Sequence, residues 1–245
     1  MLNDNAKNLI DELSQISKRG PLKGVGSGPP SVGMTLLAEL KIPYESKMKP
    51  RKNGIVVSAR RGSKSADPHR VNLFAQVPNW KISECKSSAE ILRRFGYVRD
   101  GDLKLNCTVR SSEPNPQGLI LEVDGTASRL HECFAADGQT KRFASWDFSV
   151  LEQRLIDNHP ETIWVTATAE KRGDGEYFHY RQAVYSDGSR SELLPELIKE
   201  GSVTLDHVIT KKNGRVTEKG PLFKIKPKNL QLLFPELKSY DLMSM

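Results

Sequence analysis

Apolar side chains recur every three or four residues in several stretches of the chain, and this spacing predicts helices. Between residues 5 and 18 the apolar residues that share one helical face are Leu9, Ile10, Leu13 and Ile16. Gly20 follows the last turn and predicts the end of this helix. Further helices are predicted at residues 35–40, 87–95, 147–158 and 192–199. The segment 20–33 is rich in Gly and Pro and predicts a loop before the second helix.

Runs rich in β-branched, aromatic and other apolar residues predict the strands. These strands are expected at residues 54–59, 70–77, 103–110, 118–123, 162–169, 177–185, 203–209 and 222–225. The first two are expected to lie beside each other. The segment 162–169 is expected to be a central strand, paired with 177–185 across a Gly-rich turn. Asn213-Gly214 favours a tight hairpin.

Composition agrees with a globular mixed α/β protein. The 245 residues can bury a substantial core, and no internal repeat or low-complexity tail interrupts them. No apolar run approaches the roughly 20 residues that a membrane span needs. The first 19 residues are polar and amphipathic, unlike a signal peptide. The cysteines, Cys85, Cys107 and Cys133, are widely spaced and favour buried thiols in a reducing cytoplasm over a disulfide framework or a zinc site.

The charge balance favours a polyanionic partner. Lys and Arg outnumber Asp and Glu by 37 to 30, for a net charge of +7 and an isoelectric point near 9.2. Cations that contact phosphates release condensed counterions, which favours binding to nucleic acid. Solvated charge runs are the alternative explanation. An aromatic content of 7% gives no evident stacking platform for single strands.

Two clusters hold many of these cations. The first surrounds the strand predicted at residues 54–59 and comprises Lys47, Lys49, Arg51, Lys52, Arg60, Arg61 and Lys64. The second occupies the turn after the strand at 203–209 and the strand that follows, and it comprises Lys211, Lys212, Arg215, Lys219 and Lys224. We expect these residues, apart from Lys47, to form a DNA-binding surface.

The segment 49–62 resembles the active-site strand of the MvaI/BcnI family of restriction endonucleases, within the MutH-like group. That family carries Pro-Asp and then Gly-Ile-Glu-Leu-Lys. Four further segments resemble parts of the family and occur in the same order along the chain. One, the Gly-rich entry into the second helix at 24–35, precedes the segment 49–62, and the other three, residues 71–78, 91–97 and 220–225, come after it. The family's His before the last of these is replaced by Glu218-Lys219.

The resemblance implies a MutH-like restriction-endonuclease fold: a central mixed sheet flanked by helices, with a DNA cleft between two lobes. It implies one domain over residues 1–245, with a degenerate catalytic lobe at about 1–110. Residues from about 111 to 245 would supply the remaining sheet and the DNA-recognition elements.

The family's metal-binding and catalytic positions hold other residues in this chain. The metal-binding Asp aligns with Arg51, the metal-binding Glu with Val56 and the catalytic Lys with Ser58. A further Glu, on the second helix, aligns with Leu37. Hydrolysis assisted by Mg²⁺ needs carboxylate oxygens to hold the cation, and these side chains supply none. The alignment therefore predicts no catalytic residue, no metal site and no cofactor.

The resulting expectation is a double-stranded DNA-binding protein that does not cut DNA. It would recognise a sequence or a modification in a bacterial restriction-modification or antiviral defence system, with a separate effector nuclease as partner. Arg51 is expected either to contact a phosphate in place of the missing cation or to point into solvent.

Two alternatives stay open. Displaced residues such as Glu39, Glu45 and Lys47 would support an active Mg²⁺-dependent endonuclease, although Glu-x-Lys pairs arise often by chance. Alternatively, the chain would be a scaffold subunit whose basic surface meets an acidic protein partner in a defence complex.

Overall fold

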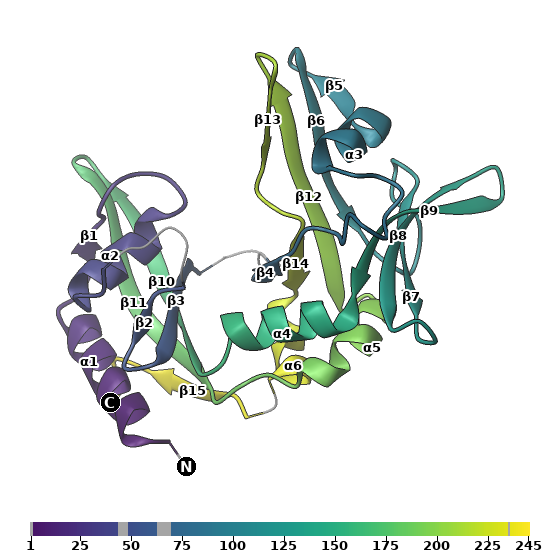
Figure 1. The fold of residues 1–245 in the computed structure, drawn as a ribbon. Coiled ribbons are helices and arrows are strands. Elements are labelled where there is room, and N and C mark those ends of the chain that lie inside the picture. The colour runs from purple at the N-terminus through teal and green to yellow at the C-terminus, as the bar shows by residue number, and fades with distance from the viewer. Residues whose placement is uncertain (1, 44–48, 63–69, 235) are drawn as a thin grey trace. The chain divides into compact units, whose positions relative to one another are not determined.

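The computed structural model describes residues 2–43, 49–62, 70–234 and 236–245 (Figure 1). The chain forms two compact units. Unit 1 comprises Met1–Pro68, Asn158–Ser189 and Phe234–Met245, and unit 2 comprises His69–Asp157 and Arg190–Leu233. Each unit is assembled from segments that are separated in the sequence. The boundaries of the units therefore do not coincide with the expected lobes at about 1–110 and about 111–245.

Unit 1 is built on one mixed sheet. Its strands, in spatial order, are β1 (Leu22–Lys23), β11 (Gly175–Ser186), β10 (Thr162–Arg172), β3 (Ile55–Arg61) and β2 (Arg51–Lys52), while β15 (Lys238–Asp241) also pairs with β11. β3 and β10 are parallel, with Val57 opposite Ile163, and the other pairings are antiparallel. The expectations of a central strand at 162–169 and of its pairing with 177–185 are confirmed.

Two helices, α1 (Asp4–Lys18) and α2 (Ser31–Glu39), cover one face of this sheet (Figure 1). The Asn3 side chain caps α1 by accepting a hydrogen bond from the Ala6 amide at 2.8 Å. The apolar face predicted for α1 is buried, and it packs against alternate residues of the strands, including Ile55 and Val57. Burial of each such side chain contributes roughly 1.5–3 kcal/mol.

Unit 2 contains two sheets. The strands of the larger one are, in spatial order, β4 (Val71–Ala75), β14 (Leu222–Ile225), β12 (Val203–Lys212), β6 (Asp102–Val109) and β5 (Tyr97–Arg99), with β13 (Arg215–Glu218) also paired with β12. The smaller one is the meander of β7 (Leu119–Asp124), β8 (Arg129–Ala136) and β9 (Gln139–Asp147). Asn213 and Gly214 both have positive φ, 49° and 78°, and they form the expected tight turn, which joins β12 to β13, a strand that the sequence did not predict.

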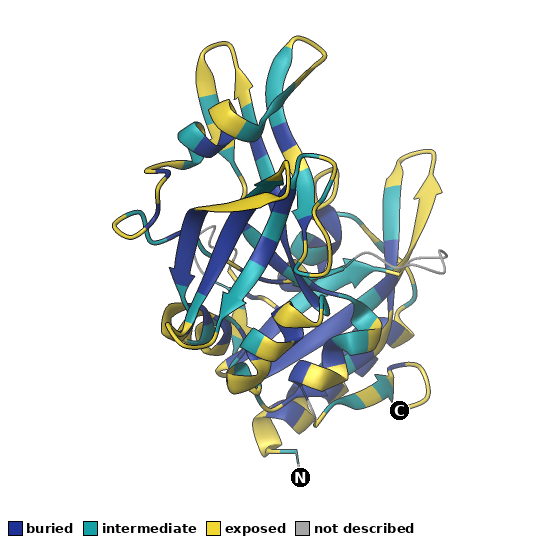
Figure 2. Ribbon diagram, turned by 90° about the vertical axis from the view of Figure 1, so that its right-hand side faces the viewer, coloured by how far each residue is buried: buried dark blue, intermediate teal, exposed yellow. Residues whose placement is uncertain are grey.

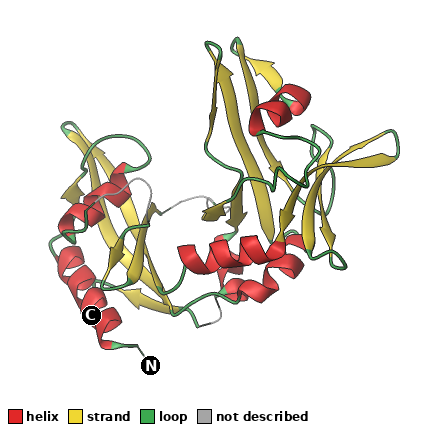
Figure 3. Cartoon of the chain, viewed as in Figure 1, coloured by secondary structure: helices red, strands yellow, loops and turns green. Residues whose placement is uncertain are grey.

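Short helices complete unit 2 (Figure 3). They are α3 (Ser88–Phe95), α4 (Phe148–Asn158), α5 (Leu194–Lys199) and α6 (Leu230–Leu233), with one-turn 3₁₀ helices η1 (Ser191–Leu193) and η2 (Pro227–Asn229). Ser87 caps α3, and its side chain accepts a hydrogen bond from the Glu90 amide. Among the described residues, no helix combines the length and the apolar character that crossing a membrane requires.

One expected strand pairing is wrong. β3 and β4 were expected to lie side by side, but β3 pairs with β10 and β2, whereas β4 pairs with β14 in unit 2. The physical reason is that β3 is buried on both faces at Val56 and Val57, as suits a parallel strand. β4 instead lies at the edge of an antiparallel sheet, where it pairs with β14 alone among the described strands. The elements that were not predicted from the sequence are β1, β2, β5, β8, β9, β13, β15 and α6.

Candidate functional site

The two faces of β3 have different surroundings. Ile55 and Val57 face α1 and α2, so the alternation of a strand directs Val56 and Ser58 to the opposite face. Val56 is fully buried, and it lies opposite Arg51 on β2. Ser58 is half-buried and lies opposite Trp164 on β10. The positions aligned with the family's Glu and Lys therefore share a face.

Leu37, on α2, is 5% exposed and belongs to the core of unit 1. It also lines a pocket of about 220 Å³ together with Lys49 and Ser58. Arg51 and Val56 do not line this pocket, so the structure places only two of the four aligned positions around it. Within the described ranges, no three His, Cys, Asp or Glu side chains gather closely enough to hold a metal ion.

Two cations of the first cluster make contacts inside unit 1. The Lys52 ammonium donates to Glu12 at 2.5 Å and to the Leu40 carbonyl at 3.0 Å. The Arg61 guanidinium forms a two-point pair with Glu176 at 3.1 and 2.7 Å. It also donates to two carbonyls of the Gly-rich loop, at Gly28 and Pro29, and stacks over the Phe178 ring. Arg61 thus ties that loop to β11.

The other cations of this cluster differ from one another. Arg60 donates from Nε to the Thr166 hydroxyl at 3.3 Å, and burial lowers the pKa of its guanidinium. Burial likewise lowers the pKa of the half-buried Lys49 ammonium. Arg51 is exposed. Lys64 lies outside the described residues, as do Lys47 and Glu45.

The second cluster lies mainly on the β12–β13 hairpin, whose cations are exposed: Lys211, Lys212, Arg215 and Lys219 (Figure 2). Lys212 and Arg215 are directly opposite each other across the two strands. Within the part of the chain that the structure describes, neither forms an ion pair with a carboxylate. Two like charges in this arrangement repel each other, and an anion bound beside them would relieve that repulsion.

Lys224, the remaining cation of the second cluster, pairs with Asp206 at 2.8 Å. Arg70 holds the same carboxylate at two points, 2.8 and 2.9 Å, and Thr108 donates to it at 2.8 Å. Burial raises the pKa of Asp206, but the hydrogen bonds from Lys224, Arg70 and Thr108 outweigh burial and hold it below its usual range. This network joins Arg70, the residue before β4, to β14, β12 and β6 on one face of the sheet.

That same face is mostly polar, although Val208 and Leu222 also lie on it. Strand alternation and register place on it the polar side chains of Lys104, Asn106, Thr108, Asp206, Thr210, Lys212, Arg215 and Thr217. The opposite face carries buried residues such as Leu105 and Ile209, and α3 contacts β6 and β12. The polar face is the candidate nucleic-acid interface of unit 2, and we call it the open sheet face.

A buried ion pair lies on the covered side of the same strands. His207 donates from Nε2 to both Glu132 oxygens, at 2.8 and 3.0 Å, and both side chains are fully buried. Burial lowers the pKa of His207, but the Glu132 carboxylate reverses this and leaves it raised. This pair was not predicted from the sequence. The inward position of His207 between Leu205 and Ile209 signals burial, but nothing local identifies Glu132 as its partner.

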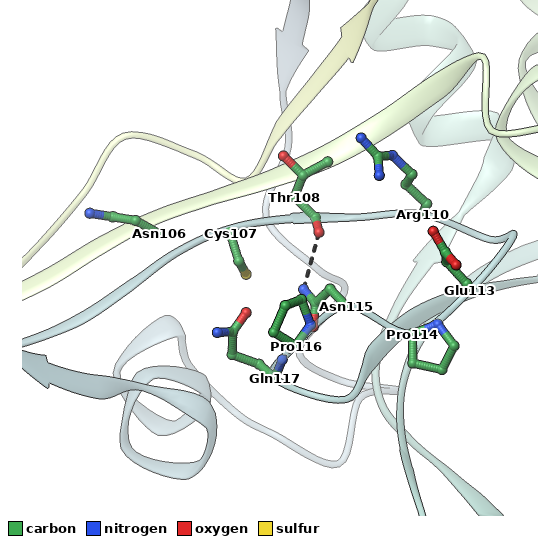
Figure 4. Close-up of a pocket in the computed structure, with 9 residues that line it drawn as sticks. All are labelled: Asn106, Cys107, Thr108, Arg110, Glu113, Pro114, Asn115, Pro116 and Gln117. Carbon is green, nitrogen blue, oxygen red and sulfur yellow. Dashed lines mark hydrogen bonds between the residues drawn. The ribbon is translucent and has the colours of Figure 1, made fainter.

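A second pocket, of about 400 Å³, opens where β6 meets the loop before β7 (Figure 4). Asn115 shapes it by donating to the Thr108 carbonyl and accepting from the Gln117 and Leu119 amides. Cys107 lines the pocket, and burial raises the pKa of its thiol to about 12. The thiol therefore stays protonated near neutral pH, which makes it a poor nucleophile or metal ligand.

The fold is that of a restriction endonuclease. It is similar to the solved structure of restriction endonuclease MvaI with its cognate DNA substrate, with a TM-score of 0.82 and 15% identity over 99% of this chain and 100% of that one. It also resembles MvaI without DNA, with a TM-score of 0.55 and 17% identity over 98% of each chain. Residues 10–234 match the MvaI/BcnI restriction endonuclease family, so the chain belongs to that family. No curated protein sequence matches the chain. The family and the fold class expected from the sequence are confirmed.

Proposed function

We propose that this chain binds double-stranded DNA and does not cut it. The observation that carries the binding is the repelling pair of Lys212 and Arg215 at the exposed end of the open sheet face. Membership of the family supports duplex DNA as the anion, and MvaI was solved with its DNA substrate. Asn106 and Thr217 are exposed on the same face and can hydrogen-bond base edges or phosphates.

The absence of cleavage rests on the side chains at the aligned positions. A Mg²⁺ ion needs several oxygen ligands in near-octahedral geometry. Leu37 and Val56 present only hydrocarbon and are at most 5% exposed, while Arg51 would repel the cation. These residues do not fit a metal ion, so no hydrolytic step is assigned to them.

We further propose that the protein acts in the bacterial cytoplasm as the reading component of a restriction-modification or antiviral defence system. A protein that recognises a sequence or a modified base without cutting needs a partner that cleaves the recognised DNA. An effector nuclease is the partner that fits the family. Selection of bound duplexes from a random DNA library would define the target sequence, and a comparison of modified and unmodified duplexes would define the modification.

The two alternatives make different demands on the molecule. A displaced nuclease centre at Glu39 would use a carboxylate that already pairs with Arg19. The other displaced residues, Glu45 and Lys47, lie outside the described residues. A scaffold subunit would use the exposed cations of the hairpin to meet an acidic protein. Neither alternative uses the polar residues beside those cations.

The deciding experiment measures duplex affinity across a range of salt concentrations, on unmodified and on methylated DNA. We expect affinity to fall steeply with salt, because each neutralised phosphate releases counterions. Digestion of both substrates with Mg²⁺ and with Mn²⁺ should give no product. Binding that ignores salt, or cleavage that survives purification to homogeneity, would contradict the proposal. Co-purification with and without nuclease treatment separates DNA binding from a scaffold role.

A further inference from the structure

The edge of β6 that faces away from β12 is open over a short stretch. β6 pairs with β12 from Leu103 to Val109, whereas its pairing with β5 on the other edge ends at Lys104. Asn115 donates from Nδ2 to the Thr108 carbonyl at 3.1 Å, so this carbonyl points away from β12. The amide and the carbonyl of one residue point to the same edge of an antiparallel strand. The Thr108 amide therefore points to the open edge as well, and no acceptor for it lies within residues 70–234.

Two side chains limit the length of this open edge. Tyr97 donates from its hydroxyl to the Asn106 carbonyl at 3.4 Å, and Asn115 occupies the position beside the Thr108 carbonyl. The two residue steps from Asn106 to Thr108 span about 7 Å of strand. A strand added to a sheet is usually about five or six residues long, or about 17–20 Å. The open edge therefore suits a compact ligand better than an extended peptide.

The pocket of about 400 Å³ at this edge has walls of mixed polarity (Figure 4). Arg110 and Glu113 are exposed and contribute one charge of each sign, so the Glu113 carboxylate would oppose a bound anion such as phosphate. The Gln117 carboxamide offers a donor and an acceptor, and it makes no side-chain hydrogen bond to residues 70–234. Pro114 and Pro116 add apolar rings. Since ligand pockets hold roughly 300–1,000 Å³, these walls suit a small, neutral ligand with donors and acceptors along its edge.

The pocket adjoins the open sheet face. Asn106 and Thr108 carry their side chains on that face, Cys107 carries its side chain on the covered face, and all three residues line the pocket. The pocket therefore passes around the edge of β6 from the open sheet face. Thr108 lies opposite Asp206, and Lys212 comes six residues later on β12, about 20 Å along the strand. Base pairs are spaced by about 3.4 Å, so one short duplex can reach both places.

We propose that this pocket holds one nucleobase extruded from a duplex that lies on the open sheet face. The assignment rests on the proposed function and names the place where a base is read. The Thr108 amide donates to an acceptor on the edge of the base, and the Asn106 carbonyl accepts from a neighbouring N–H. The Gln117 carboxamide supplies a further donor and acceptor, as Gln does when it binds adenine at two points. A base outside the stack exposes its whole pairing edge, including any modified exocyclic group, to such contacts.

The first test does not depend on duplex binding. Each of the four deoxynucleosides is titrated into the ¹⁵N-labelled protein while the Thr108 amide resonance is followed, with deoxyribose as the control for the sugar. We expect at least one deoxynucleoside to give a saturable shift that deoxyribose does not reproduce. Gln117→Leu should bind that deoxynucleoside about tenfold more weakly, because it removes the carboxamide and keeps a similar size. Gln139→Leu, the matched control at the exposed start of β9, should bind as the unmodified protein does.

Three results of this titration would contradict the proposal. The absence of a shift with every deoxynucleoside would overturn the site. An equal shift with deoxyribose would overturn the assignment to a base. Unchanged affinity in Gln117→Leu would place the base outside this pocket. If Gln117→Leu does not fold, Gln117→Asn replaces it, because the shorter side chain withdraws the same carboxamide from the ligand.

The second test measures extrusion from a duplex. One strand carries 2-aminopurine, whose fluorescence rises when the base leaves the stack, at a position that is either paired or mismatched. Extrusion requires unpairing, and a mismatched base has already lost part of its pairing energy. We expect the mismatched duplex to bind about tenfold more tightly than the paired one, with a rise in fluorescence. Both effects should disappear in Gln117→Leu and persist in Gln139→Leu.

A preference for the mismatch that persists in Gln117→Leu would assign it to the flexibility of the duplex and overturn extrusion into this pocket. Binding of the mismatched duplex without a rise in fluorescence would also overturn extrusion, while DNA binding would stand. If the protein binds neither duplex, the proposed function falls. The deoxynucleoside titration then decides by itself whether the pocket takes a base.

Discussion

The two sheets of this protein hold their charges in different places. The sheet of unit 1 has an apolar core under α1 and α2, and its cations Lys52 and Arg61 are engaged at the edges of that core. The large sheet of unit 2 buries an ion pair on one face and displays exposed cations at the end of the other. Cations of two basic clusters that look alike in sequence therefore have different surroundings. A cation that is already paired with a carboxylate is less available to a ligand than an exposed one.

The largest expected effect comes from the buried pair of unit 2. Replacing His207 with Leu leaves the Glu132 carboxylate buried without its partner, which should cost about 3–5 kcal/mol. Amide hydrogen exchange in β6 and β12 measures this loss within unit 2. The double variant His207→Leu/Glu132→Leu should be more stable than the single one, because it removes the stranded charge as well. Equal stability of the two would mean that the pair does not act as an ion pair.

The next effect concerns Arg61 in unit 1. Arg61→Met removes the pair with Glu176 and the guanidinium hydrogen bonds to the Gly28 and Pro29 carbonyls, at a cost of about 1–3 kcal/mol because the site is partly exposed. Thermal unfolding measures the loss. Duplex affinity of the folded variant should not change. A loss of affinity at full stability would place Arg61 on the DNA surface and break the contrast between the clusters.

The buried pair should also make unit 2 depend on pH. The pKa of His207 is raised from its ordinary 6.5, so the stabilisation is complete below that value and is lost as pH rises through the higher folded pKa. The slope is at most about 1.4 kcal/mol per pH unit for one proton. Hydrogen exchange in β12, compared between about pH 6 and about pH 9 after correction for the intrinsic exchange rate, should show weaker protection at the higher pH. The dependence should vanish in His207→Leu/Glu132→Leu, and its persistence there would assign it to other groups.

The smallest expected change in stability comes from replacing the exposed cations of the β12–β13 hairpin, and this replacement tests DNA binding most directly. Lys212→Ala/Arg215→Ala should change stability by less than about 0.5 kcal/mol, since both side chains are exposed. Duplex affinity should fall by about 0.5–1 kcal/mol per cation, with a salt slope smaller by about 2. The control Lys199→Ala/Lys228→Ala removes the same charge from α5 and η2. Equal losses in the two variants would show that net charge, rather than the open sheet face, governs binding.

The sequence by itself determined five of the six α-helices described, about half of the strands and the family, because these depend on local periodicity and on short ordered motifs. The apolar face of α1 and the Asn213-Gly214 turn follow directly from residue spacing and backbone preference. The replacement of carboxylates at positions 51 and 56 is likewise visible without coordinates.

Tertiary structure decided which strands pair and which charges meet. The expected neighbour of β3 was wrong because parallel pairing joins strands far apart in the chain, and local pattern does not specify such partners. His207 and Glu132 meet across 75 residues, as Arg61 and Glu176 do across 115. Coulombic and hydrogen-bond partners depend on distance in space, so a run of basic residues fixes the net charge while the folded chain determines which of those charges stay free.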